Sequence, residues 1–245
     1  ELLLPDNLLR TDSVIAKMVS AIEEEDWKEV EIIGWLYQFY ISERKAQVMG
    51  KVVKSADIPA ATQLFTPNWI VKYLVQNSVG RLWLQADPSS LLQAEWEYYV
   101  EPAEQAPEVR SELAALIAAR VDQDGGRLNP ESITVIDPAC GSGHILVEVY
   151  EVLKNAYLER GYQLRAIPRL ILEKNIFGVD IDERAAQLTA FAIVMKARAD
   201  DRRLFSEPVA LNIAFLRDTK ALPVDELASH LASDGETRSA IASPS

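Results

Sequence analysis

The stretch ITVIDPACGSG, from Ile133 to Gly143, decides the fold of this 245-residue chain. An apolar, β-branched run ends at Asp137, passes through two glycines and leads into a long helical pattern that stops near Gly161. This order indicates a strand, a tight loop and a helix. In an open α/β sheet such an order builds a ligand site at the carboxyl end of a strand, because glycines let a ligand approach the backbone and the helix start offers unpaired N–H groups. We therefore expect a nucleotide-like ligand here.

Two further units repeat the pattern of a strand that ends in an acid. The run Ile176 to Ile181 ends in an acidic pair and precedes helical spacing from Arg184 to Arg198, and Val209 to Phe215 is followed by Asp218. The residues Ile133 to Ile136 are apolar or β-branched, as in a strand that is covered on both faces. Strands that alternate with helices predict an α/β fold with a doubly wound parallel sheet.

The regions before and after these units carry helical patterns. Residues Leu2 to Val53 repeat apolar side chains every three or four positions, so we expect a helical pair packed on its neighbours, with Trp27, Trp35 and Tyr37 in the core. The predicted division is a helical region at 1–57, a core at 58–222 with a helical insertion at about 85–129, and a helix with a frayed tail at 223–245.

Thr66 and Pro67 form a typical helix start. Threonine is a good N-cap, and proline is favoured at the first helical position. We predict that Thr66 caps the helix rather than contacting a ligand, since capping is the common use of a threonine at this place. The buried stripe of that helix would consist of Ile70, Val71, Leu74 and Val75.

The composition limits the classes of function. A formal net charge of −12, with 37 acidic and 25 basic residues, argues against a basic surface that would neutralise many phosphates. The single cysteine excludes an internal disulfide and a multi-cysteine zinc site, and we predict no metal site and a cytoplasmic location. Neither a run of about 18 apolar residues nor a signal peptide is present, so we expect no membrane contact.

Three ligand classes compete for the glycine loop. A phosphate-binding P-loop requires a lysine where this chain has His144, so that class is nearly excluded. A dinucleotide fingerprint requires a third glycine where Leu146 stands and an acid about 20 positions on, whereas Asp180 lies much further away. The third class binds S-adenosylmethionine, whose cationic sulfonium and ammonium groups suit the carboxylate of Asp137.

Three motifs together carry a resemblance to a known family. DPACGSG (137–143) resembles the first motif of the amino-group DNA methyltransferases, FGVDID (177–182) resembles their second, and QLFTP (63–67) resembles the additional motif that precedes the first in many adenine-specific enzymes. IGWLYQFYISERK (33–45) and IPAATQLFTPNWIVKYLVQNSVGRLWL (58–84) resemble specifically the PglX methyltransferases of bacterial BREX phage-defence systems. The resemblance covers roughly residues 33–218 and implies a Rossmann-like methyltransferase sheet, incomplete in this chain, with S-adenosylmethionine as cofactor.

The resemblance also implies a role for each matching residue. Thr66 would hold the methionine carboxylate, Asp137 the methionine ammonium and Asp180 both ribose hydroxyls. Ile181 would lie against the adenine ring, and Asp218 would read the adenine amino group. The residues that would shape the wall or bring their backbone against the cofactor are Phe65, Pro67, Pro138, Ala139, Cys140, Gly141, Ser142 and Gly143.

Two side chains near the loop suggest other chemistry that we reject. Cys140 would have to act as a nucleophile, but it occupies a loop position that requires a small side chain, and no neighbouring base lowers its pKa. His144 stands at the start of a helix, where we expect it to pack over the loop or to meet solvent rather than to act as a general base.

One motif of the family does not occur in this chain. Amino-group DNA methyltransferases hold the flipped base with Asp, Asn or Ser followed by Pro-Pro and an aromatic residue, and no such tetrapeptide is present. We therefore expect the amino-terminal, cofactor-binding part of an adenine-N6 DNA methyltransferase that marks host DNA, with double-stranded DNA bound by parts outside this chain and other BREX proteins as partners. Two alternatives stay open: a catalytically silent S-adenosylmethionine-binding or scaffolding module, and a nicotinamide oxidoreductase.

Overall fold

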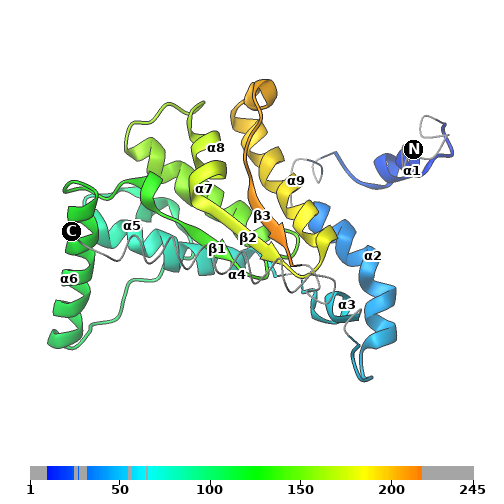
Figure 1. The fold of residues 1–245 in the computed structure, drawn as a ribbon, viewed down its shortest axis with the longest axis horizontal. Coiled ribbons are helices and arrows are strands. Elements are labelled where there is room, and N and C mark those ends of the chain that lie inside the picture. Colours follow the sequence, from blue (N-terminus) through cyan, green and yellow to red (C-terminus); the bar gives the residue numbers. More distant parts are fainter. Residues whose placement is uncertain (1–9, 25–26, 28–31, 55–56, 65, 217–245) are drawn as a thin grey trace, which may run out of the picture. The chain divides into compact units, whose positions relative to one another are not determined.

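The sheet consists of three parallel strands in the order β1-β2-β3 (Figure 1). The computed structural model describes residues 10–24, 27, 32–54, 57–64 and 66–216. Its helices and strands are α1 (Val14–Ala21), α2 (Ile32–Val48), α3 (Ile58–Thr62), α4 (Asn68–Val75), α5 (Arg81–Ala86), α6 (Pro107–Gln123), β1 (Val135–Asp137), α7 (His144–Glu159), α8 (Ile167–Leu170), β2 (Ile176–Asp180), α9 (Glu183–Asp200) and β3 (Asn212–Phe215). The parallel pairing confirms the predicted α/β class with a parallel sheet.

Helix α7 lies at the centre of the hydrophobic core. It begins directly after Gly143 and buries its residues at helical spacing, among them Leu146, Tyr150, Leu153 and Tyr157, which are all fully buried. The helix ends before Gly161, which adopts a positive φ of 83°, as the sequence predicts. Because α7 contacts β1, β2, α4 and α9, its packing sets the position of the loop that precedes it.

The two faces of the sheet are covered unequally. Helices α7 and α9 contact each other and the strands, and Gly178 on β2 lies directly below Leu146 of α7. On the opposite face Ile136 of β1 is 64% exposed, and Ala214 of β3 is also exposed. The prediction that the first strand is covered on both faces is therefore wrong for the described residues, because these two helices pack on one side of the sheet.

The amino-terminal helices form where the sequence predicts them, but they bury less than predicted. Helix α1 has no buried residue, and Val14 is 74% exposed. In α2 Tyr37 is buried as predicted, whereas Trp35 is 44% exposed. Trp27, which precedes α2, is 38% exposed. The prediction of a core position was wrong for both tryptophans, because apolar spacing shows that a helix has an apolar face and does not show that a neighbour covers it.

Helix α4 packs against α7, and α5 contacts α6. Val71 and Val75 of α4 are buried as predicted, Ile70 is partly buried, and Leu74 is 45% exposed, because α7 covers only one side of this short helix. Helix α6 lies within the predicted helical insertion and has no buried residue. Gly125 and Gly126 follow it with positive φ angles of 81° and 94°, which glycine adopts readily in a turn.

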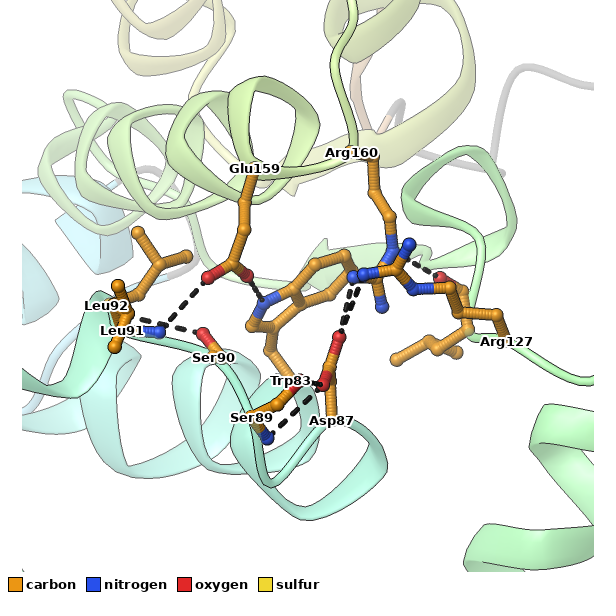
Figure 2. A network of polar contacts seen from close by, with 10 residues as sticks. Trp83, Asp87, Ser89, Ser90, Leu91, Leu92, Arg127, Glu159 and Arg160 are labelled. Atoms are coloured by element: carbon orange, nitrogen blue, oxygen red, sulfur yellow. Dashed lines mark hydrogen bonds and ion pairs between the residues drawn. The ribbon is translucent and has the colours of Figure 1, made fainter.

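A polar network fastens the end of α7 to the end of α5 (Figure 2). The indole N–H of Trp83 donates to Glu159 at 2.7 Å, and the guanidinium of Arg160 lies 4.2 Å from the centre of the Trp83 ring. Arg160 also pairs with Asp87 at 2.6 Å, and Arg127 reaches the same carboxylate oxygen at 3.3 Å. Helix α7 is therefore fixed by polar contacts at the end opposite to the glycine loop.

The two arginines that share Asp87 give a matched test of this network. The Arg160 side chain is 7% exposed and the Arg127 side chain is 63% exposed. We expect Arg160→Ala to lower the free energy of unfolding by about 3 kcal/mol, since it leaves a buried carboxylate with a weaker partner. Arg127→Ala should cost about 0 to 1 kcal/mol, as exposed pairs do. Urea unfolding measures both, and equal losses would contradict the assignment.

Asp87 should also make the stability depend on pH. Burial raises the pKa of this carboxyl, but hydrogen bonds from Ser89, Arg160 and Arg127 outweigh burial and lower the pKa from 3.8 to about 2. The stabilisation is therefore fully present above pH 3.8 and is lost as the pH falls through 2. The difference in unfolding free energy between the native chain and Asp87→Asn should shrink by about 2 kcal/mol between pH 5 and pH 2. A constant difference would contradict the shift.

Candidate functional site

The glycine loop between β1 and α7 is held by backbone hydrogen bonds to the neighbouring strand. The N–H of Cys140 donates to the carbonyl of Val179 at 3.0 Å, and the N–H of Gly143 donates to the carbonyl of Cys140 at 2.9 Å. Gly141 and Gly143 have φ angles of 55° and 92°, which other residues rarely adopt. The loop therefore turns sharply at the carboxyl ends of β1 and β2.

Helix α9 and the segment before α4 also contact this loop. The hydroxyl of Thr189 on α9 donates to the carbonyl of Gly141 at 2.8 Å. A Cβ atom at Gly143 would lie 3.1 Å from Thr189, and one at Gly141 would lie 3.2 Å from the side-chain amide of Gln63. The sequence reasoning missed both Thr189 and Gln63, although Gln63 is the first residue of the QLFTP motif.

Asp180 joins the loop to the end of β2. Its side chain is buried, with one carboxylate oxygen accepting from the N–H of Gly141 at 2.8 Å and the other accepting from the N–H of Asp182 at 2.8 Å. Each oxygen keeps a second lone pair, which a ligand hydroxyl can use. Asp180 therefore both fixes the loop and offers acceptors at the strand end.

Asp137 lies at the entrance of the same loop. Burial raises the pKa of its carboxyl, the N–H of Ala139 opposes this shift with a hydrogen bond of 3.1 Å, and the negative charge of Asp180 raises it further. A bound cation would relieve both the burial and the repulsion between these two acids. The two carboxylates therefore favour a ligand that brings positive charge and hydroxyl groups.

The start of α4 differs from the prediction. Pro67 is the N-cap residue, with φ −53° and ψ 142°, and α4 begins at Asn68. The prediction that Thr66 caps the helix and Pro67 opens it was wrong, because the extended ψ of Pro67 moves the helix start one residue onward. The Thr66 hydroxyl thus has no capping role, and Thr66 lies three residues after the Gln63 that approaches the loop.

The remaining predicted residues occupy different environments. Ile181 is 50% exposed at the end of β2, Pro138 and Ala139 are exposed, and Ser142 is buried. The structure brings Asp137, the loop 138–143, Asp180 and Ile181 into one region. Phe65 and Asp218 lie outside the described residues.

Two other side chains in this region stay neutral near pH 7. Burial raises the pKa of the Cys140 thiol to about 11, which agrees with the rejection of a nucleophilic role. Burial lowers the pKa of His144 to about 4, so its imidazole is neutral at pH 7. The described residues contain no group of three or more His, Cys, Asp or Glu side chains arranged to hold a metal ion.

Comparisons with known proteins show what this chain is similar to. The sequence profile of the family described as N-6 DNA Methylase matches residues 110–206. An adenine-specific methyltransferase named BrxX, from Escherichia coli O9:H4 (strain HS), is 65% identical over 220 residues, which are 90% of this chain. An adenine-specific methyltransferase named PglX, from Lacticaseibacillus casei (strain Zhang), is 43% identical over 218 residues, or 83% of the chain. Over most of its length this chain is therefore similar in sequence to adenine-specific methyltransferases of the PglX type.

The chain spans only a part of these PglX-family relatives. It covers 18% of the first and 17% of the second. One solved structure was also matched, the nuclease-deletion mutant of the Type ISP restriction-modification enzyme LlaGI in complex with a DNA substrate mimic. The alignment covers 84% of this chain and 22% of the LlaGI chain, at 14% identity and a TM-score of 0.31. Helices α1 to α9, as far as they are described, are too short or too polar to cross a membrane.

The reactivity of Cys140 tests how readily the glycine loop opens and exposes its thiol to solvent. With a pKa of about 11 the thiol is almost fully protonated at pH 8, and its side chain is buried. We expect iodoacetamide to modify it about 100-fold more slowly in the folded chain than in urea. Mass spectrometry of the intact chain over time measures both rates. Rates within about tenfold of each other would show that the loop opens readily.

Proposed function

We propose that this chain is the cofactor-binding part of an adenine-N6 DNA methyltransferase and that it binds S-adenosylmethionine at the glycine loop. The single observation that carries the proposal is the hydrogen bond from the N–H of Gly141 to Asp180. This bond brings the glycine loop, Asp137 at its entrance and the acidic end of β2 into one site. Sequence similarity to adenine-specific methyltransferases over most of the chain supports the choice of reaction and of cofactor.

The residues present fit this cofactor chemically. Its sulfonium and ammonium groups are cationic, and the two acids of the site, Asp137 and Asp180, carry complementary charge. Its ribose has two hydroxyls, and Asp180 has a free lone pair on each oxygen. The positive φ angles of Gly141 and Gly143 open the backbone to a close ligand.

Each predicted residue receives a role in this proposal. Asp137 holds the ammonium group, Asp180 accepts from the ribose hydroxyls, and the half-exposed Ile181 lies against the adenine ring. Thr66, which has no capping role, binds the methionine carboxylate. The backbone of 138–143 contacts the cofactor, Phe65 and Pro67 shape the wall beside Thr66, and Asp218 reads the adenine amino group.

The finer fold assignment belongs to the same proposal. The three strands are parallel, and along the chain α7 connects β1 to β2 and α9 connects β2 to β3. This arrangement agrees with half of a doubly wound, Rossmann-like methyltransferase sheet. The exposed face that carries Ile136 would be covered by parts that the relatives have and this chain does not span. In a doubly wound fold, ligands bind outside the carboxyl ends of the strands, where the glycine loop lies.

The methyl transfer itself requires parts beyond this chain. When bound, S-adenosylmethionine supplies an electrophilic methyl group, and the residues of this chain hold and orient the cofactor and exclude water from it. The tetrapeptide that holds a flipped adenine does not occur in the 245 residues, so we assign base capture and DNA binding to the remainder of the relatives' length. Adenine marks made in this way would label host DNA as self in a BREX phage-defence system, together with other BREX proteins.

Calorimetric titration tests the proposed cofactor. We expect the 245-residue chain to bind S-adenosylmethionine and not NAD, because its two acids disfavour a pyrophosphate. Asp180→Ala should weaken S-adenosylmethionine binding by about 1 to 3 kcal/mol, the usual cost of leaving hydroxyl groups unpaired. Asp122→Ala, which removes the same charge from the exposed surface of α6, is the matched control and should leave the dissociation constant unchanged. Equal affinities for the two variants would contradict the ribose role.

A further inference from the structure

Helix α2 touches both sides of the proposed cofactor site, although it lies outside the residues matched by the methylase profile. We propose that α2 forms one wall of this site, with Gly34 and Tyr37 as positioning residues that hold the glycine loop and the end of β2 in the geometry that binds the cofactor. The proposal rests on the proposed function, because the ligand is the one assigned there. Three separate contacts support it.

The first contact joins the backbone of α2 to the glycine loop. Gly34 is buried, and a Cβ atom built there would lie 2.2 Å from the imidazole Nε2 of His144 and 2.8 Å from the hydroxyl of Ser142. Both distances are far below van der Waals contact, so a side chain at this position would force the side chains of His144 and Ser142, or α2 itself, to shift. Gly34 therefore lets the helix backbone lie directly on the loop.

The second contact joins α2 to the end of β2. The hydroxyl of Tyr37 donates a hydrogen bond to Oδ2 of Asp182, while Oδ1 of Asp182 accepts from the N–H of Arg184 and so caps α9. The N–H of Asp182 in turn donates to Asp180 at 2.8 Å. Tyr37 is thus two hydrogen bonds away from the carboxylate that is proposed to bind the ribose.

The third contact anchors the helix. Tyr37 and Ile41 pack with Ala185 of α9 in a small cluster that is separate from the main core. Gly34, Tyr37 and Ile41 are spaced by three and four residues and therefore share one face of α2. A pocket of about 440 Å³, lined in part by Tyr40 and Arg44, lies beside this face.

These contacts have a consequence for cofactor binding. The loop is tied to Asp180 through Gly141, and the end of β2 is tied to Asp180 through Asp182. Helix α2 contacts the glycine loop through Gly34 and is bonded to Asp182, just after β2, through the hydroxyl of Tyr37. A displacement of α2 would therefore alter the orientation of Asp180.

The replacement of Tyr37 by Phe tests the proposal, with Tyr40→Phe as its matched control. Both variants remove one phenolic hydroxyl from the same helix, but the hydroxyl of Tyr40 accepts from Arg184 and does not reach Asp182. By calorimetry on the full 245-residue chain, we expect Tyr37→Phe to weaken S-adenosylmethionine binding about fivefold and Tyr40→Phe to change it less than twofold. Gly34→Ala should weaken it more than about tenfold, because the added methyl group has no space.

Amide hydrogen exchange without cofactor separates positioning from general stability. We expect Tyr37→Phe to speed exchange at the amides of Gly141 and Asp182, which both donate to Asp180, and to leave the amides of Leu153 and Tyr157 in α7 as slow as in the native chain. Equal speeding at all four would indicate a merely structural role and overturn the proposal. Exchange and affinity that match those of Tyr40→Phe would also overturn it. If the native chain does not bind S-adenosylmethionine, the proposed function fails instead, and the exchange data still decide whether α2 positions Asp180.

Discussion

The hydrogen bond from the N–H of Gly141 to the carboxylate of Asp180 is the constraint on which the site depends. It joins two chain segments that are distant in sequence, the glycine loop before α7 and a strand that ends in an acid. A buried carboxylate is unfavourable unless it is hydrogen-bonded, and two backbone N–H groups meet that need for Asp180. The same bonds fix the orientation of the carboxylate, which keeps a second lone pair on each oxygen.

The packing of α7 makes this constraint possible. Leu146 in the first turn of the helix packs against Gly178, and the helix ends in the network around Trp83 and Arg160, so it is fixed at both ends. A helix fixed in this way cannot slide relative to the sheet, and the loop at its start keeps its distance from β2. The position of the loop therefore follows from contacts that lie at the far end of the helix as well as from the glycines.

The sequence predicted the elements of the central unit well because each leaves a local signal. Apolar runs, positive-φ glycines and acids at strand ends indicated β1, α7, β2 and α9. Thr66 was misjudged because proline fixes φ but not ψ, and it is the ψ of Pro67 that decides where α4 begins. Trp35 was misjudged because apolar spacing does not show which face is covered. The contacts of Gly34 and Tyr37 join residues far apart in the chain, and no spacing rule indicates them.

The strand order also bears on how the chain folds. Each parallel pair, such as Val135 with Ile176 or Phe177 with Asn212, forms only after the intervening helix has closed a long segment of chain. Closing such segments costs conformational entropy before the contacts between the strands can offset it. Topologies of this kind therefore fold slowly compared with helical bundles. Helix α7, whose backbone hydrogen bonds are local, can form early and supply the surface on which the strands then assemble.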